Sequence, residues 1–128
     1  MSSRVTVYIV DDDASVRKGL ERVVRSADFD AKTFESAGAF FAAGFTEHNS
    51  CLIVDAKMPR SGGLDMLETL KSEHVSIPVI VVTAHDDPAT RKAASDAGAV
   101  GYFRKPVDAD ALLDAITWAL ARRDTKEQ

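Results

Sequence analysis

Residues 5–13 read VTVYIVDDD, a nearly continuous apolar run that ends in three aspartates. Runs without polar alternation are typical of strands that are covered on both faces, as in parallel sheets. Two further apolar runs of strand length occupy residues 51–54 and 77–83. Weaker strand candidates lie at residues 29–34 and 99–103. The pattern indicates a central parallel sheet.

Longer segments with helical spacing separate these strands. Their apolar residues recur at intervals of three and four, which places them on one face of a helix. These residues are Val16, Leu20, Val23, Val24 and Ala27, then Leu64, Leu67 and Leu70, and finally Leu112, Ile116 and Leu120. Ser36 marks the start of another helix, with phenylalanines at positions 40, 41 and 45. Five βα units predict an α/β fold with helices on both faces of a doubly wound sheet, because crossovers between parallel strands are right-handed.

The helix expected over residues 87–97 differs from the others. It offers only small apolar side chains, namely Ala89, Ala93, Ala94 and Ala97. At about 0.8 kcal/mol per buried methylene-sized group, such a helix is held less firmly than its leucine-rich neighbours. We therefore expect this helix to be the element that moves.

Size and composition limit the possible functions. A chain of 128 residues, 45% hydrophobic and 28% charged, corresponds to one globular domain. We expect this domain to cover residues 1–121, and the polar residues 122–128 to form a tail or the start of a linker to an output domain. A net charge of −4 argues against direct nucleic-acid binding by this domain. We also expect no membrane association, because no apolar run approaches about 20 residues, and a cytoplasmic location.

Polar and acidic side chains follow the predicted strands at their carboxyl ends, where open α/β sheets bind ligands. In chain order they are Asp11, Asp12, Asp13, Asp55, Thr83 and Lys105. Two carboxylates about 4 Å apart repel by about 4 kcal/mol at an effective dielectric constant of 20, so a cluster of this kind calls for a cation. Mg²⁺ is the natural occupant, because it takes one or two carboxylates together with waters and phosphate oxygens.

These residues belong to a set of short motifs that together cover nearly the whole chain. The motifs are Val10-Asp11-Asp12, Asp55 followed by Met58-Pro59 and Gly62-Gly63, Thr83-Ala84 and Lys105-Pro106. In this order they resemble the receiver domain of two-component response regulators. The neighbouring residues are most similar to receivers of the FixJ type, whose members usually carry a helix-turn-helix output domain that controls transcription. The resemblance implies a flavodoxin-like (CheY-like) fold with five helices and five parallel strands in the order 2-1-3-4-5.

The resemblance also implies how the acidic residues act. Asp55 is expected to accept a phosphoryl group from a sensor histidine kinase. Asp12 is expected to bind Mg²⁺ (or Mn²⁺) directly and Asp11 to hold a metal-bound water, while Asp55 and the backbone carbonyl of Lys57 complete the ligands. Lys57 and His85 occupy the positions that are expected to tune the lifetime of the acyl phosphate. The sequence does not indicate whether they lengthen or shorten it. Beyond its own phosphorylation and dephosphorylation, the domain is not expected to be an enzyme.

The response to phosphorylation is implied by the same resemblance. Lys105, in a cis peptide bond with Pro106, and the hydroxyl of Thr83 are expected to contact the phosphoryl oxygens, and Tyr102 to move into the space that Thr83 leaves. Two charge-assisted hydrogen bonds contribute about 3–6 kcal/mol. Shifting an equilibrium between two conformations from 1:99 to 99:1 needs about 5.5 kcal/mol. We expect a large but incomplete switch, and phosphorylation-dependent homodimers through the face formed by the fourth helix, fifth strand and fifth helix.

Three other functions remain open at this point. The run Asp11-Asp12-Asp13-Ala14-Ser15 also fits the start of haloacid-dehalogenase-like phosphatases, in which Asp11 would be the nucleophile and Mg²⁺ the cofactor. The later acidic pair that such an enzyme needs would be Asp86-Asp87, which follows the Thr83-Ala84 pair after one intervening residue. A flavodoxin-type FMN protein would have to bind phosphate with a first loop that carries three carboxylates. The domain could also be an interaction module that works without phosphorylation.

Several residues have simpler interpretations. Asp13 directly precedes the first helix and is expected to cap it rather than bind metal. Cys51 lies within an apolar strand and is expected to be inert packing. His48 and His74 are expected to face solvent. Trp118 lies off the apolar stripe of its helix, which favours a place in a partner surface.

Overall fold

The computed structural model describes residues 4–58 and 62–127, and residues 123–127 as backbone only. Strands and helices alternate along the chain: β1 (Thr6–Val10), α1 (Ala14–Ser26), β2 (Asp30–Phe34), α2 (Ala37–Ala43), β3 (Ser50–Asp55), α3 (Gly63–Ser72), β4 (Val79–Thr83), α4 (Pro88–Asp96), β5 (Gly101–Arg104) and α5 (Ala109–Glu127). The strands form one parallel sheet in the order β2-β1-β3-β4-β5. The predicted fold class is confirmed.

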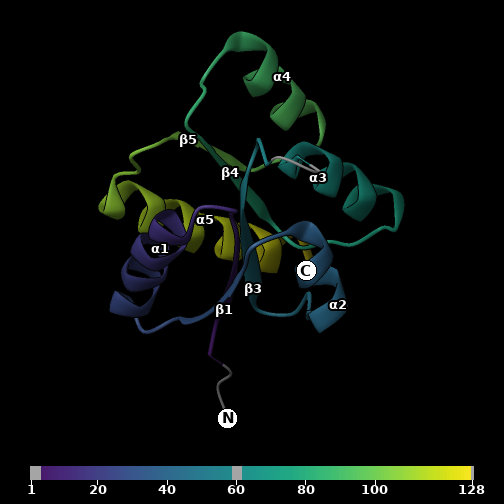
Figure 1. Cartoon of the computed structure of the whole chain (residues 1–128). Helices are drawn as coiled ribbons and strands as arrows, with labels where there is room; N and C mark the ends of the chain where they lie inside the picture. The colour runs from purple at the N-terminus through teal and green to yellow at the C-terminus, as the bar shows by residue number, and fades with distance from the viewer. Residues whose placement is uncertain (1–3, 59–61, 128) are drawn as a thin grey trace.

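The helices form two layers around this sheet (Figure 1). Helices α1 and α5 pack on one face and α2, α3 and α4 on the other. Alternate residues of a strand point to opposite faces, so in β3 Cys51 and Ile53 enter the first layer while Leu52 and Val54 enter the second. Because both faces are covered, the positions of β3 and β4 between the strand ends are apolar, namely residues 51–54 and 79–82. No helix within the described residues is both long and apolar enough to cross a membrane.

Two strands start two residues later than the sequence predicts. β4 begins at Val79 rather than at residue 77, since Pro78 has no N–H and contributes only its carbonyl, which accepts from Leu52. β5 begins at Gly101 rather than at residue 99. Gly98 has a φ of 95° and the N–H of Ala99 bonds back to α4, so these residues close that helix instead of extending the strand.

Helix α4 buries little apolar surface, as predicted, and Ala94 is the one predicted residue that is fully buried. Ala94 is buried, but Ala89 is exposed and the second buried side chain is that of Thr90. The helix begins at Pro88, and Asp87 caps it by accepting from the backbone N–H of Thr90 at 2.7 Å. This helix depends on its cap and on polar contacts more than on an apolar stripe.

Helix α5 extends through Glu127, beyond the residue-121 boundary predicted for the domain. Its last residues are mostly Ala, Arg, Lys and Glu, which have high helix propensity. The segment expected as a tail is therefore helical as far as it is described, and residue 128 lies outside the described part. The domain boundary itself stays a prediction.

Candidate functional site

The turn after β1 is held rigidly by its own hydrogen bonds. Asp11 is fully buried, and its Oδ1 accepts from the backbone N–H of Asp13 at 2.9 Å. Asp13 in turn caps α1 by accepting from two backbone N–H groups of the first turn, as predicted. Arg17 reaches back from α1 and donates from Nη1 to the backbone carbonyl of Asp11 at 2.7 Å. The turn leaves Asp12 exposed beside the buried Asp11.

The end of β3 is packed directly against the start of α3. Asp55 is 6% exposed, and its Oδ1 accepts from the backbone N–H of Lys57 at 3.1 Å. The backbone N–H of Gly63 donates to the carbonyl of Ala56 at 3.1 Å, and a Cβ at Gly63 would overlap the backbone carbonyl of Asp55. This close approach explains the glycine of the motif. Pro59 of the same motif lies outside the described residues.

The strand ends gather three carboxylates around one point. One oxygen each of Asp11, Asp12 and Asp55 lies within 4.8 Å of the others. Lys105, which follows β5 and precedes a cis peptide bond to Pro106 as predicted, places Nζ 2.8 Å from Asp11 Oδ2 and 3.2 Å from Asp55 Oδ2. All three acidic side chains offer hard oxygen donors, without nitrogen or sulfur, so this set fits a hard divalent cation such as Mg²⁺.

The electrostatics of this cluster favour an added cation. Burial raises the pKa of Asp55, and the charge of Asp11 raises it further, while the N–H of Lys57 and the ammonium of Lys105 act in the opposite direction. Burial alone would lower the pKa of Lys105, but the hydrogen bonds and charges of Asp11 and Asp55 raise it overall. One ammonium therefore faces three carboxylates, and their charge is not fully compensated within the site.

Thr83 ends the neighbouring strand but points its hydroxyl elsewhere. Asp55 pairs in register with Val82, so Thr83 lies one residue beyond it on β4. Thr83 is fully buried, and its Oγ1 accepts from the backbone N–H of His85 at 3.0 Å and donates to the carbonyl of His85 at 3.3 Å. In this conformation the hydroxyl is hydrogen-bonded to the backbone of the loop that leads to α4.

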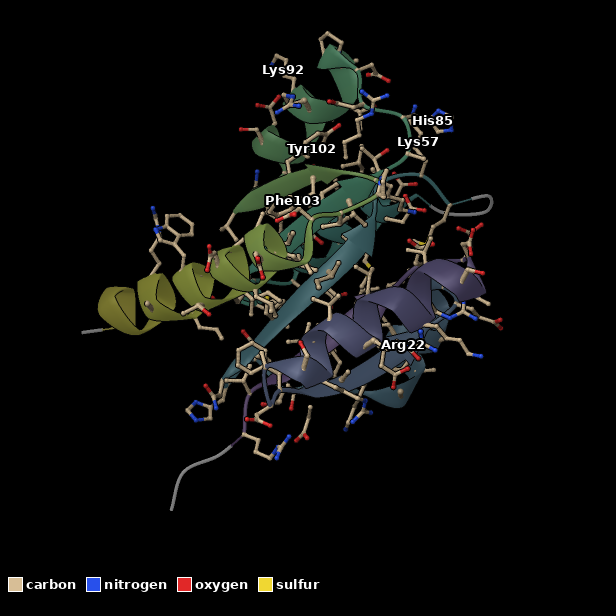
Figure 2. The ribbon with its side chains drawn as sticks, turned by 90° about the vertical axis from the view of Figure 1, so that its left-hand side faces the viewer. Arg22, Lys57, His85, Lys92, Tyr102 and Phe103 are labelled. Atoms are coloured by element: carbon tan, nitrogen blue, oxygen red, sulfur yellow. The ribbon has the colours of Figure 1, made fainter. Side chains whose placement is uncertain are left out.

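Tyr102 is part of β5, and its side chain points toward α4 (Figure 2). Its ring is covered by Arg91, whose Cζ is 4.6 Å from the ring centre, and Arg91 also donates to both carboxylate oxygens of Asp86 at 3.0 and 3.2 Å. The phenol oxygen is buried and has no hydrogen-bond partner among the described residues. Burial, followed by the nearby Asp86, raises the pKa of Tyr102. The sequence analysis missed Arg91, whose only sequence signal is a cation in the first turns of an alanine-rich helix.

Lys57 and His85 both project outward at the acidic end of the sheet (Figure 2). The side chain of Lys57 is 51% exposed, and its Nζ lies 3.5 Å from Oδ2 of Asp87. His85 is exposed and contacts Thr83 through its backbone. Both residues therefore lie near the acidic cluster, while their side chains remain in solvent.

The remaining singled-out residues lie away from this cluster. Cys51 is fully buried, and burial raises its pKa to about 12, which keeps the thiol unreactive. His48 and His74 are exposed, as predicted. Trp118 is 49% exposed, with Arg122 Cζ 4.8 Å from its ring centre. Its place in a partner surface stays a prediction.

Comparison with known proteins identifies the family. The model of the response regulator receiver domain matches residues 7–117. The response regulator protein TodT of Pseudomonas putida is 40% identical over 121 residues, which are 94% of this chain and 53% of TodT. The DNA-binding transcriptional regulator NtrC of Salmonella typhimurium is 34% identical over 125 residues, 98% of this chain and 27% of NtrC. The chain thus spans about a quarter to a half of the length of these relatives.

A solved structure described as FixJ-N has a TM-score of 0.84 and 35% identity to this chain, and covers 94% of this chain and 96% of its own. This agrees with the FixJ-type resemblance of the motifs. The alternative of a haloacid-dehalogenase-like phosphatase with Asp11 as nucleophile finds no support, since the matched family is regulatory. By the extent of the family match and by its close relatives, the chain belongs to the response regulator receiver domains.

Proposed function

We propose that Asp55 accepts a phosphoryl group from a sensor histidine kinase and that the domain reports this through a change in conformation. Receiver domains are regulatory, receive their phosphoryl group from a histidine kinase, and bind Mg²⁺ at an acidic pocket. The observation that carries the assignment of Asp55 is the cluster itself, in which Asp11, Asp12 and Asp55 oxygens lie within 4.8 Å beside the ammonium of Lys105.

Asp11, Asp12, Asp55 and the backbone carbonyl of Lys57 would hold Mg²⁺ (or Mn²⁺). When bound, the ion neutralises the acids and stabilises charge on the phosphoryl oxygens. A carboxylate oxygen of Asp55 forms the new P–O bond while the bond between phosphorus and the imidazole nitrogen of the donor breaks. Lys105, already 3.2 Å from Asp55 Oδ2, turns its charge to the phosphoryl oxygens. The chain catalyses no other reaction than its own phosphorylation and dephosphorylation.

The switch uses Thr83 and Tyr102. Thr83 turns its hydroxyl from the backbone of His85 to the phosphoryl oxygens, and the Tyr102 ring enters the space that is left. The sheet register supports this step: Tyr102 pairs with Val81, two residues before Thr83, and residues two apart point to the same face of a sheet. The buried phenol oxygen of Tyr102 has no hydrogen-bond partner among the described residues, so no hydrogen bond has to break when the ring moves.

The output is a homodimer that forms on phosphorylation through the face of α4, β5 and α5. Val100 and Trp118, large hydrophobic side chains that are 39% and 49% exposed, support this proposal, since Val100 directly precedes β5 and Trp118 lies on α5. Lys57 and His85 tune the lifetime of the acyl phosphate from their positions beside Asp55 and Thr83. Sizing of the protein with and without phosphodonor tests the dimer.

Labelling with acetyl phosphate and Mg²⁺ tests the phosphoacceptor. We expect one phosphoryl group on Asp55 by peptide mass mapping, none in Asp55→Ala, and full labelling in Asp65→Asn, which changes an exposed carboxylate on α3. A label on Asp11 with steady turnover of a phosphomonoester would contradict the proposal in favour of the phosphatase. Failure of the wild-type chain to label at all would revive the interaction module.

A further inference from the structure

Asp87 makes two contacts with its two carboxylate oxygens. Oδ1 accepts from the backbone N–H of Thr90 at 2.7 Å and so caps α4, while Oδ2 lies 3.5 Å from Nζ of Lys57. The hydrogen bond to Thr90 is the main cause that lowers the pKa of Asp87, and Lys57 adds to it. This carboxylate therefore joins the first turn of α4 to the loop that follows β3.

Lys57 contacts both the acceptor and α4. Its backbone N–H donates to Asp55 Oδ1 at 3.1 Å, which places the base of its side chain beside the acceptor carboxylate. Its ammonium, on a flexible four-carbon stem, extends to Asp87. The side chain is 51% exposed, so it is free to turn within the loop.

Phosphorylation would place a stronger competitor beside this ammonium. A phosphoryl group carries a charge of about −1.5 to −2 with three acceptor oxygens, whereas an exposed ion pair such as Lys57–Asp87 is weak. We propose that Lys57 is a charge-operated link between the acceptor and α4: its ammonium pairs with Asp87 before phosphorylation and moves to the phosphoryl oxygens afterwards, which releases the first turn of α4. This inference rests on the proposed function of Asp55.

The surroundings of α4 make the release effective. This helix buries only Thr90 and Ala94, so a lost charge contact is a sizeable part of what restrains it. Asp87 still caps the helix through Oδ1, so the helix shifts without unfolding.

Hydrogen exchange of the α4 amides measures this release, with beryllofluoride and Mg²⁺ as the phosphoryl mimic. In the wild type we expect exchange of the amides of residues 89–92 to rise about twofold to fivefold with the mimic. Lys57→Met and Asp87→Asn, which retains a capping side chain, should exchange faster without the mimic and lose most of the response. The double variant should equal either single variant, and Lys57→Arg should restore the response.

Lys92→Met is the matched control. It removes an ion pair of the same helix, Lys92–Asp96 at 2.8 Å, from the side of α4 away from Lys57 (Figure 2), and should keep the full response. A full response in Lys57→Met, or additive effects in the double variant, would overturn the inference. Acetyl phosphate labelling of each variant separates the two proposals. If the wild type forms no adduct, both the proposed function and the link are wrong. If the wild type forms the adduct but the exchange response does not depend on Lys57, the link alone is wrong.

Discussion

Helices α3 and α4 lie on the same face of the sheet but are held there in opposite ways. Helix α3 buries Met66, Leu67 and Leu70, and its first residue is packed against the end of β3. Helix α4, nearly as long, buries one alanine and one threonine, and charged groups supply further contacts at its surface. This difference fits the proposed function, in which α3 would fix the strand that carries Asp55 while α4 would respond to phosphorylation.

The largest expected effect concerns the packing of α3, which should be the more firmly anchored helix. Leu67→Ala should lower the free energy of unfolding by about 2–5 kcal/mol, because Leu67 is 2% exposed and its removal leaves a cavity. Urea unfolding monitored by circular dichroism measures this. Ala89→Gly in α4, at an exposed position, should lower it by about 1 kcal/mol or less. Equal losses for the two variants would show that the two helices are anchored alike.

Bound Mg²⁺ should increase the difference in anchoring between α3 and α4. At a Mg²⁺ concentration of about 100 times Kd, binding to the folded chain adds about 2.7 kcal/mol of stability, and the acidic cluster next to the start of α3 should show it. We expect the urea midpoint of the wild type to rise with Mg²⁺ and to return on chelation. Asp12→Asn should lose most of the effect, while Asp28→Asn, at an exposed turn after α1, should retain it. A midpoint independent of Mg²⁺ in the wild type would argue against the metal site.

The close approach of α3 to β3 gives a third test. Gly63→Ala should lower the free energy of unfolding by about 1–3 kcal/mol, because the added methyl group overlaps the carbonyl of Asp55. Gly19→Ala is the matched control, since its Cβ would meet nothing within 4 Å in the middle of α1, and it should raise stability by about 0.5–1 kcal/mol. A neutral Gly63→Ala would mean that the start of α3 can shift away from β3.

The same contrast explains what the sequence could and could not predict. The acidic cluster was predictable because the carboxyl ends of parallel strands meet at one edge, and this brings Asp11 and Asp55 together whatever the details of the loops. The anchoring of α4 was not, because contacts such as Arg91 on Tyr102 and Lys57 on Asp87 depend on the rotamers of exposed long side chains. Such side chains have many partners within reach, and no periodicity marks the one that is chosen.

The smallest expected effect concerns that surface anchoring. Arg91→Met removes the cation over Tyr102 and the pair with Asp86, and should lower the free energy of unfolding by only about 0.5–1 kcal/mol. Because the charge of Arg91 lowers the pKa of Tyr102 against the larger effect of burial, its loss should raise that pKa further, measurable by ultraviolet titration of the phenol. Arg22→Met, which changes an exposed arginine of α1 (Figure 2), should leave both quantities unchanged. If Arg91→Met left the exchange of α4 amides unaltered, α4 would be held by its two buried side chains after all, and its difference from α3 would be one of degree only.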